Sequence, residues 1–141
     1  MPVIDVVSDT NVVLKWFYQD GEEEAADSAL DLLDLYSQKA ISLRILNLTP
    51  YEVGNAMIRK RATQEEISGT VSAVVDICPI VTPSGADWSL AAALAVQHGL
   101  SFYDAAYAAV AQRRNAYLAT FDRKLLGVGL GQLPDKLIHI L

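Results

Sequence analysis

Residues 3–9 read VIDVVSD, a short run of β-branched residues that ends in a serine and an aspartate. Valine and isoleucine favour an extended, buried strand, and the polar pair marks the point where that strand ends. A short helix is expected next, over Thr10–Phe17, because the turn-forming residues Gln19-Asp20-Gly21 follow it. A buried strand followed directly by a helix is the repeating unit of α/β folds.

The alternation of strands and helices continues along the rest of the chain. Further strands are expected over residues 41–48, 77–81, 116–120 and 137–140, with helices over 22–38, 49–62, 84–98, 101–114 and 123–126 and another that starts at 63. Strands separated by helices favour an α/β sandwich with a largely parallel sheet. The sequence has no internal repeat, low-complexity tract or linker, so residues 1–141 are expected to form a single domain.

Composition excludes several classes of protein. With 52% apolar residues the chain is too apolar for intrinsic disorder, yet its longest apolar runs, 90–96 and 105–111, are far shorter than the ~18 residues of a membrane span. No basic stretch precedes an apolar segment at the N-terminus, so a secretory signal is not expected. The single cysteine, Cys78, excludes an intramolecular disulfide framework and is expected in a buried strand. These features indicate a soluble, cytoplasmic globular domain.

The charge distribution argues against general affinity for nucleic acid. The net charge is −6, and nine of the seventeen acids lie at or before Asp34, where Lys15 is the only base. The helix expected over 22–38 is therefore strongly acidic, which fits a solvated face or a surface for a basic partner. A negative chain gains little from counterion release on a phosphate backbone. A nucleic-acid role would need local basic patches, or metal ions that reverse the sign of an acidic site.

Four acids lie where the elements of such a fold meet. Asp9 directly follows the first strand, Asp122 lies two residues past a later strand, and Glu52 and Asp104 each lie in the first turn of a helix. Ligands of open parallel sheets bind at the carboxyl ends of strands, where the following helices begin. Carboxylates gathered there would repel one another unless cations entered, and hard oxygen ligands suit Mg²⁺ or Mn²⁺.

Helix capping explains the same four acids equally well. The pattern Ser/Thr-x-x-Glu/Asp, which forms capping boxes, occurs at four helix starts, residues 49, 63, 84 and 101. Glu52 and Asp104 are then simple caps, and Asp9 and Asp122 are N-caps of the turns that follow them. Spacing alone does not decide between a metal site and capping.

The segments around the four acids carry more information together than the acids do singly. In chain order they read VSDTNVV (7–13), PYEVGNA (50–56), LSFYDAAY (100–107) and ATFDRKL (119–125). In order and spacing they resemble the motifs of the PIN domain family, particularly the VapC-type toxins of type II toxin–antitoxin pairs. The resemblance covers essentially the whole chain.

This resemblance implies a three-layer α/β/α sandwich and a metal-dependent endoribonuclease. Four acids map onto the family's acidic pocket, where they bind Mg²⁺ or Mn²⁺ that activates water to attack an RNA phosphodiester: Asp9, Glu52, Asp104 and Asp122. Asn11 and Thr120 map onto small polar positions that help to hold the acids and water. The resemblance also implies a homodimer and an antitoxin protein whose tail inserts near the acidic groove.

Other functions compete with this hypothesis. A solitary PIN nuclease in RNA maturation would need no antitoxin, and a non-catalytic PIN-like module would bind RNA or protein without cleaving it. A phosphoacceptor receiver domain is also small and acidic. It usually has adjacent acids near the first strand and a lysine after the fifth strand, and neither pattern is convincing in this sequence.

Several further groups are expected to have structural roles or to contact RNA. The basic clusters 59–61, 113–114 and 123–124 suit phosphate contacts, although the first two are equally explained by helix C-termini. The aromatic residues 16–18 are expected mainly in the core. The glycines of residues 127–131 lack the lysine and following helix of a phosphate-binding loop, and a flexible surface loop is expected there.

Overall fold

A four-stranded parallel sheet forms the centre of the molecule in the computed structural model, which describes residues 3–19, 21 and 23–141. The strand order is β3-β2-β1-β4, with the strands β1 (Ile4–Ser8), β2 (Ile41–Leu46), β3 (Ile80–Val81) and β4 (Tyr117–Ala119). Val6 pairs with Leu43 of β2, and Val7 pairs with Leu118 of β4. The first strand is therefore internal to the sheet, and its carboxyl end lies between those of two neighbours.

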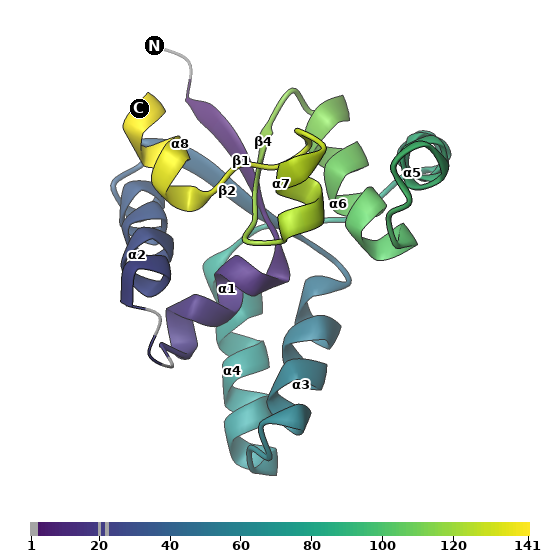
Figure 1. Cartoon of the computed structure of the whole chain (residues 1–141). Coiled ribbons are helices and arrows are strands. Elements are labelled where there is room, and N and C mark those ends of the chain that lie inside the picture. The colour runs from purple at the N-terminus through teal and green to yellow at the C-terminus, as the bar shows by residue number, and fades with distance from the viewer. Residues whose placement is uncertain (1–2, 20, 22) are drawn as a thin grey trace.

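Helices cover both faces of the sheet, which confirms the predicted α/β/α sandwich (Figure 1). The helices are α1 (Thr10–Phe17), α2 (Glu23–Ser37), α3 (Thr49–Arg59), α4 (Gln64–Ile77), α5 (Gly85–His98), α6 (Phe102–Arg113), α7 (Arg123–Gly127) and α8 (Pro134–Ile140). Val6 packs into a core shared with α1 and α2, whereas its neighbour Val7 packs into a second core shared with α5 and α6. This alternation follows from the two-residue period of a strand. Within residues 3–19, 21 and 23–141, no helix has the length and apolar character needed to cross a membrane.

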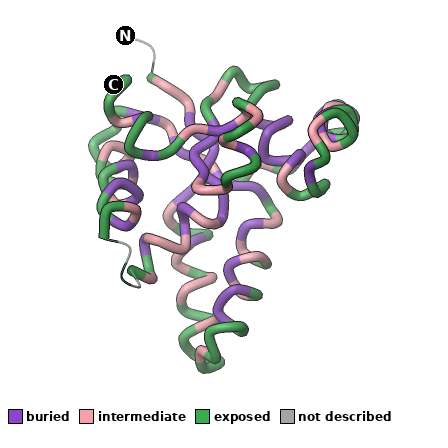
Figure 2. The backbone as a smooth tube through the Cα atoms, in the orientation of Figure 1, coloured by how far each residue is buried: buried purple, intermediate pink, exposed green. Residues whose placement is uncertain are grey.

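The helices α3 and α4 form a hairpin that projects from the sheet (Figure 1), and its far end is exposed (Figure 2). The hairpin turns at Thr63, where the predicted capping box is present. The Thr63 hydroxyl accepts a hydrogen bond from the Glu66 amide at 3.2 Å, and the Glu66 carboxylate accepts one from the Thr63 amide at 2.8 Å. These two bonds satisfy the backbone amides of Thr63 and Glu66 within the turn itself. The hairpin can therefore extend away from the core.

Two predicted strands differ from the structure. Residues 137–140 belong to the helix α8, which begins at Pro134, a residue suited to the first helical turn, and buries Pro134 and Leu137 on one side. The strand predicted over 77–81 shortens to two residues, because Ile77 ends α4 and Cys78 is its C-cap. Cys78 is buried as expected, but it lies outside a strand.

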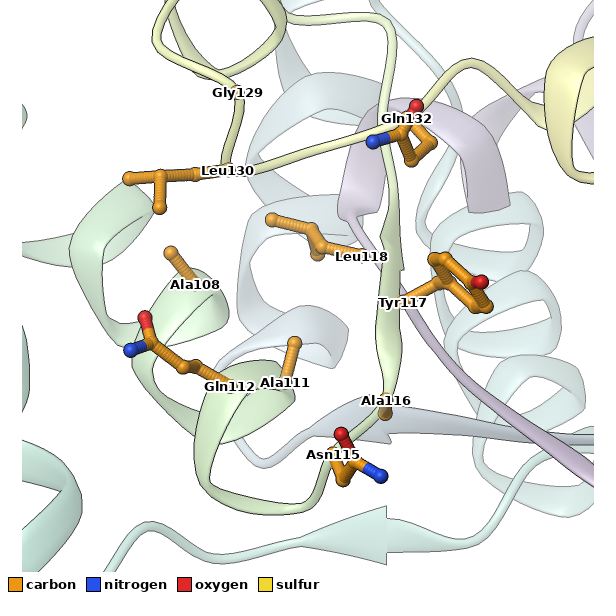
Figure 3. A pocket seen from close by; sticks show the side chains of 10 residues that line it. All are labelled: Ala108, Ala111, Gln112, Asn115, Ala116, Tyr117, Leu118, Gly129, Leu130 and Gln132. Carbon is orange, nitrogen blue, oxygen red and sulfur yellow. The ribbon is translucent and has the colours of Figure 1, made fainter.

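The glycine-rich segment 127–131 does not behave as a flexible surface loop throughout. Gly131 is buried. The next residue, Gln132, makes two backbone hydrogen bonds: its N–H donates to the Leu118 carbonyl at 2.8 Å, and its carbonyl accepts from the Thr120 N–H at 3.0 Å. Figure 3 shows this segment passing beside β4, with Gln132 and Leu130 on either side of Leu118. A hollow of about 310 Å³ opens between the segment, β4 and α6, but it is lined by no carboxylate and no basic side chain.

Gly131 leaves no room for a side chain. A Cβ atom there would lie 2.4 Å from the methyl group of Thr120 and 3.5 Å from the Leu118 carbonyl oxygen. We expect Gly131→Ala to destabilise the protein by about 1–3 kcal/mol in urea unfolding, because Thr120 is held by its own hydrogen bonds and cannot withdraw.

The matched control is Gly69→Ala in α4, where a Cβ would meet nothing within 4 Å. Alanine is the better helix former, so this variant should be more stable by about 0.5–1 kcal/mol. Equal stability of Gly131→Ala and the wild-type protein would show that Thr120 is not fixed in place.

Candidate active site

The four acids predicted from the sequence lie at one rim of the sheet. Asp9 follows β1 and Asp122 follows β4, while Glu52 and Asp104 lie in the first turns of α3 and α6. Burial raises the pKa of Asp9 and that of Asp104; the negative charges of Asp104 and Glu52 add to the first shift, and that of Asp122 adds to the second. The structure therefore brings all four carboxylates into one electrostatically coupled group.

Asp9 is the most deeply buried member of the group, with 6% of its surface exposed. Its Oδ1 accepts a hydrogen bond from the Thr10 amide, and its Oδ2 accepts one from the Thr120 hydroxyl, both at 2.8 Å. Burial raises the pKa of Asp9 to about 7, although these two hydrogen bonds lower it. Near neutral pH this carboxyl group is poised between its acid and its charged form.

The Thr120 hydroxyl joins three of the polar residues at the rim. Besides donating to Asp9, its Oγ1 accepts hydrogen bonds from the Asp122 amide at 2.9 Å and from Asn11 Nδ2 at 3.3 Å. Asn11 Oδ1 in turn accepts a hydrogen bond from the Phe121 backbone amide at 3.1 Å. The two residues expected to have supporting roles thus connect α1 to the segment that follows β4, and Thr120 holds Asp9 directly.

Glu52 is held by two hydroxyl groups. Its Oε1 accepts from Thr10 Oγ1 at 2.6 Å and from the Tyr107 hydroxyl at 2.8 Å. Thr49, predicted to cap α3 with Glu52, instead bonds to the Tyr107 hydroxyl at 2.6 Å, and the N-cap position belongs to Leu48. The capping interpretation is therefore wrong for Glu52, whose carboxylate points toward α1 and α6.

Sequence reasoning assigned no role to Thr10 or Tyr107, although a signal for both was present. Thr10 directly follows Asp9. Tyr107 lies three residues after Asp104, so the side chains of Asp104 and Tyr107 lie on one face of α6. Burial raises the pKa of the Tyr107 phenol, which keeps the hydroxyl protonated as a hydrogen-bond donor.

The other acids combine capping with membership of the group. Asp9 is the N-cap of α1, and Asp122 caps α7 by accepting the Lys124 and Leu125 amides at 2.9 Å. The Ser101 hydroxyl accepts the Asp104 amide at 3.1 Å, while burial, with the charge of Asp122, raises the pKa of Asp104. Capping and clustering are not alternatives at these positions, because the helix starts themselves converge.

The predicted basic clusters differ in their relation to this rim. Lys124 donates to the Gly99 carbonyl, and its charge offsets part of the rise that burial causes in the pKa of Asp104. Arg59 shares a hollow of about 390 Å³ with Glu52. Arg113 instead pairs with Asp87 at 2.9 Å. Two clusters thus reach the rim, and a third is engaged in the fold.

The aromatic residues 16–18 divide between the core and the surface. Trp16 is buried, with its indole N–H donating to the Ala29 carbonyl at 3.0 Å, whereas Phe17 is exposed. The Tyr18 ring lies 5.1 Å from the Lys60 ammonium group. Burial in the core is therefore correct for Trp16 and wrong for Phe17.

The donor set suits a hard divalent cation bound partly through water. In the part of the chain that the structure describes, no three His, Cys, Asp or Glu side chains are placed to hold a metal ion as they stand. Mg²⁺ does not require such a cage, since it usually takes one or two carboxylates and keeps several waters. Asp9 and Asp104, coupled and with raised pKa values, supply oxygen ligands that a cation would stabilise in their charged form.

The raised pKa of Asp9 makes stability depend on pH. The unfolded chain loses this proton near pH 3.8 and the folded chain near 7, so between these values the folded state binds more protons. Rising pH therefore destabilises the metal-free protein, by as much as about 4 kcal/mol from this group alone. We expect Asp9→Asn to lose less stability than wild type between pH 4.5 and 7.5 in urea unfolding with EDTA.

The exposed Asp31→Asn in α2 serves as the control for the change of charge, and it should keep the wild-type slope. If Asp9→Asn and wild type have parallel stability profiles, the Asp9 carboxyl group titrates normally and the coupled group does not exist.

Comparisons with known proteins agree with this architecture. The PIN domain family model matches residues 6–129. A curated relative, exonuclease VapC9 of Pyrobaculum aerophilum, is 36% identical over 95 residues, which span 64% of this chain and 70% of that protein. The crystal structure of PAE2754 from Pyrobaculum aerophilum aligns with a TM-score of 0.71 and 25% identity over 97% of this chain and 88% of that one. A toxin–antitoxin complex from Klebsiella pneumoniae contains a chain with a TM-score of 0.66 and 21% identity, covering 92% and 97%. The family model covers most of the chain, which therefore belongs to the PIN domain family.

Proposed function

We propose that this chain is a divalent-metal-dependent endoribonuclease, the toxin of a VapBC-type pair, and that residues 1–141 act as a single PIN-like domain. One observation carries the proposal: the Asp9 carboxyl group is buried, held by Thr10 and Thr120, at the rim of the sheet where Glu52 and Asp104 also lie. Negative charges gathered in this way repel one another and destabilise the fold. A bound cation would remove that repulsion. The relationship to exonuclease VapC9 supports a nuclease.

Each residue of the proposed site has a definite part in holding oxygen ligands. The Thr10 amide and the Thr120 hydroxyl fix the two oxygens of Asp9, while Thr10 and Tyr107 fix one oxygen of Glu52. Thr10 therefore links the two acids directly. Asp9 and Asp104 would hold Mg²⁺ or Mn²⁺, with Glu52 and Asp122 completing the set together with water.

The chemistry follows from what such an ion supplies. A divalent cation held by these residues would supply an activated water molecule and would neutralise charge on the phosphodiester. The negative composition of the chain is then compatible with an RNA substrate, since positive charge is supplied where the phosphate lies. Arg59 and Lys124 are the basic residues that line or contact this rim, and we assign to them contacts with flanking phosphates.

The proposed antitoxin distinguishes a toxin from a solitary PIN nuclease. The VapC name of a relative and the toxin–antitoxin complex among the structural neighbours support a protein partner. The exposed carboxylates Asp27, Asp31 and Asp34 of α2 offer such a partner a negative face. Isolation of the chain from its own cells without any small bound protein would favour the solitary nuclease.

Cleavage of RNA tests the proposal directly. We expect the purified protein to cut RNA with Mg²⁺ or Mn²⁺ and to lose all activity in EDTA. Asp104→Asn should lower kcat/KM by at least about 100-fold, because a metal ion contributes several kcal/mol to stabilising the transition state. A circular RNA substrate separates endonuclease from exonuclease action, since a circle offers no end to an exonuclease.

Asp31→Asn, which removes an exposed carboxylate of α2, controls for the change in net charge and should keep full activity. Cleavage that survives EDTA, or an Asp104→Asn variant as active as wild type, would contradict the metal-dependent mechanism. Failure to cut any RNA in a broad panel would favour the non-catalytic binding module.

We also propose that the chain forms a homodimer through the α3–α4 hairpin. A groove of about 560 Å³ lies between this hairpin and β3, and four of the residues that line it are exposed and apolar: Tyr51, Ile58, Val75 and Ile80. Tyr51 and Ile58 are 78% and 62% exposed, which is unfavourable in water and is relieved when a second copy covers them.

Ile58→Glu should convert the dimer to a monomer, because it places a charge in the middle of this groove. Light scattering coupled to size-exclusion chromatography measures the mass in solution at several concentrations. The control is Val96→Glu on α5, where the wild-type side chain is equally apolar and 87% exposed. A wild-type monomer at all concentrations, or an Ile58→Glu dimer, would contradict this interface.

A further inference from the structure

A chain of hydroxyl groups runs through the buried interior between α1, α3 and α6. Tyr107 lies at its centre with no exposed surface, although it comes from an otherwise alanine-rich segment of α6. Its hydroxyl lies 2.6 Å from Thr49 Oγ1, 2.8 Å from Thr10 Oγ1 and 2.8 Å from Glu52 Oε1. One phenol oxygen thus contacts three polar groups, one from α1 and two from α3.

The available protons give this chain a direction. A carboxylate can only accept, so the Tyr107 proton is donated to Glu52 Oε1. Tyr107 has no second proton, and Thr49 must therefore donate to the Tyr107 oxygen. Thr49 Oγ1 in turn accepts the backbone amide of Leu46, the last residue of β2, at 3.2 Å. The hydrogen bonds lead one way, from the backbone of the sheet to the Glu52 carboxylate.

This chain restricts a side chain that would otherwise be mobile. Glu52 is only half-buried and has three side-chain torsions, whose freedom is lost only where contacts fix them. Among the described residues, hydrogen bonds reach its carboxylate only at Oε1, from Tyr107 and from Thr10. The other oxygen, Oε2, accepts no hydrogen bond from the described residues, and Glu52 lines a hollow together with Arg59 and Tyr103.

We propose that Tyr107 is a positioning residue whose hydroxyl, oriented by Thr49, holds the Glu52 carboxylate ready for the metal and the substrate. This inference rests on the proposed nuclease function. Tyr107 acts through Glu52 and does not touch RNA, because its side chain is completely buried. Packing alone would not require the hydroxyl, since phenylalanine fills the same space without the burden of burying a polar group.

The test is a double-mutant cycle with Tyr107→Phe and Glu52→Gln. In the wild-type background Tyr107→Phe should lower kcat by about 10–100-fold and leave KM within about twofold, as expected for loss of a residue that orients a metal ligand. In the Glu52→Gln background the same substitution should change kcat by less than about twofold, because its target carboxylate is already absent.

Binding of Mn²⁺, measured by calorimetry without RNA, supplies a readout that is independent of cleavage. Tyr107→Phe should weaken Mn²⁺ binding by about 10-fold in the wild-type background and leave it unchanged in the Glu52→Gln background. Thr49→Val, which removes the group that orients Tyr107, should act in the same direction, and Thr49→Ser should restore wild-type values. The Thr49 pair also keeps the inference testable if Tyr107→Phe fails to fold.

The outcomes separate this inference from the proposed function. If the wild-type protein cleaves RNA but Tyr107→Phe has equal effects in both backgrounds, Tyr107 has a purely structural role and the nuclease proposal stands. Full activity and full Mn²⁺ affinity in both Tyr107→Phe and Thr49→Val would also overturn the inference. If the wild-type protein neither binds Mn²⁺ nor cleaves RNA, both the inference and the proposed function are lost.

Discussion

The burial of the Asp9 carboxyl group at the end of β1 is the constraint on which the rest of the site depends. Because β1 is internal to the sheet, its last residues are covered by helices on both faces, and Asp9 loses its water. Two hydrogen bonds, from Thr10 and Thr120, compensate this loss only in part, since the pKa still rises to about 7. The fold thus holds a group whose charge needs a partner.

The parallel topology explains why residues distant in sequence surround that group. The chain returns to the same rim after every crossover, so the starts of α3 and α6 lie beside the ends of β1 and β4. Helix N-termini favour negative side chains, which is why Asp9 and Asp122 can cap helices and still belong to the acidic group. The same geometry serves folding and ligand binding at once.

The sequence was sufficient to predict that the four acids lie at one rim of the sheet, and the resemblance to the PIN family pointed to Asn11 and Thr120, which lie at the same rim. It was insufficient where a local pattern has two physical meanings. Thr49 and Glu52 have the spacing of a capping box, but tertiary contacts with Tyr107 override it. The apolar residues 137–140 suit a strand, yet Pro134 starts a helix that packs on α2. The close approach of Gly131 to Thr120 depends on three-dimensional contacts that no spacing encodes.

The four acids can act in catalysis only if they bind a divalent cation. The most direct measurement is the pKa of the Asp9 carboxyl group. The ¹³C NMR shift of its carboxyl carbon follows the titration, without divalent ions and with saturating Mg²⁺. We expect a pKa near 7 in the metal-free protein and a fall of several units when Mg²⁺ binds, because the cation favours the charged form. A pKa near 4 that does not respond to Mg²⁺ would contradict it, since Asp9 would then be neither destabilised by burial nor a ligand.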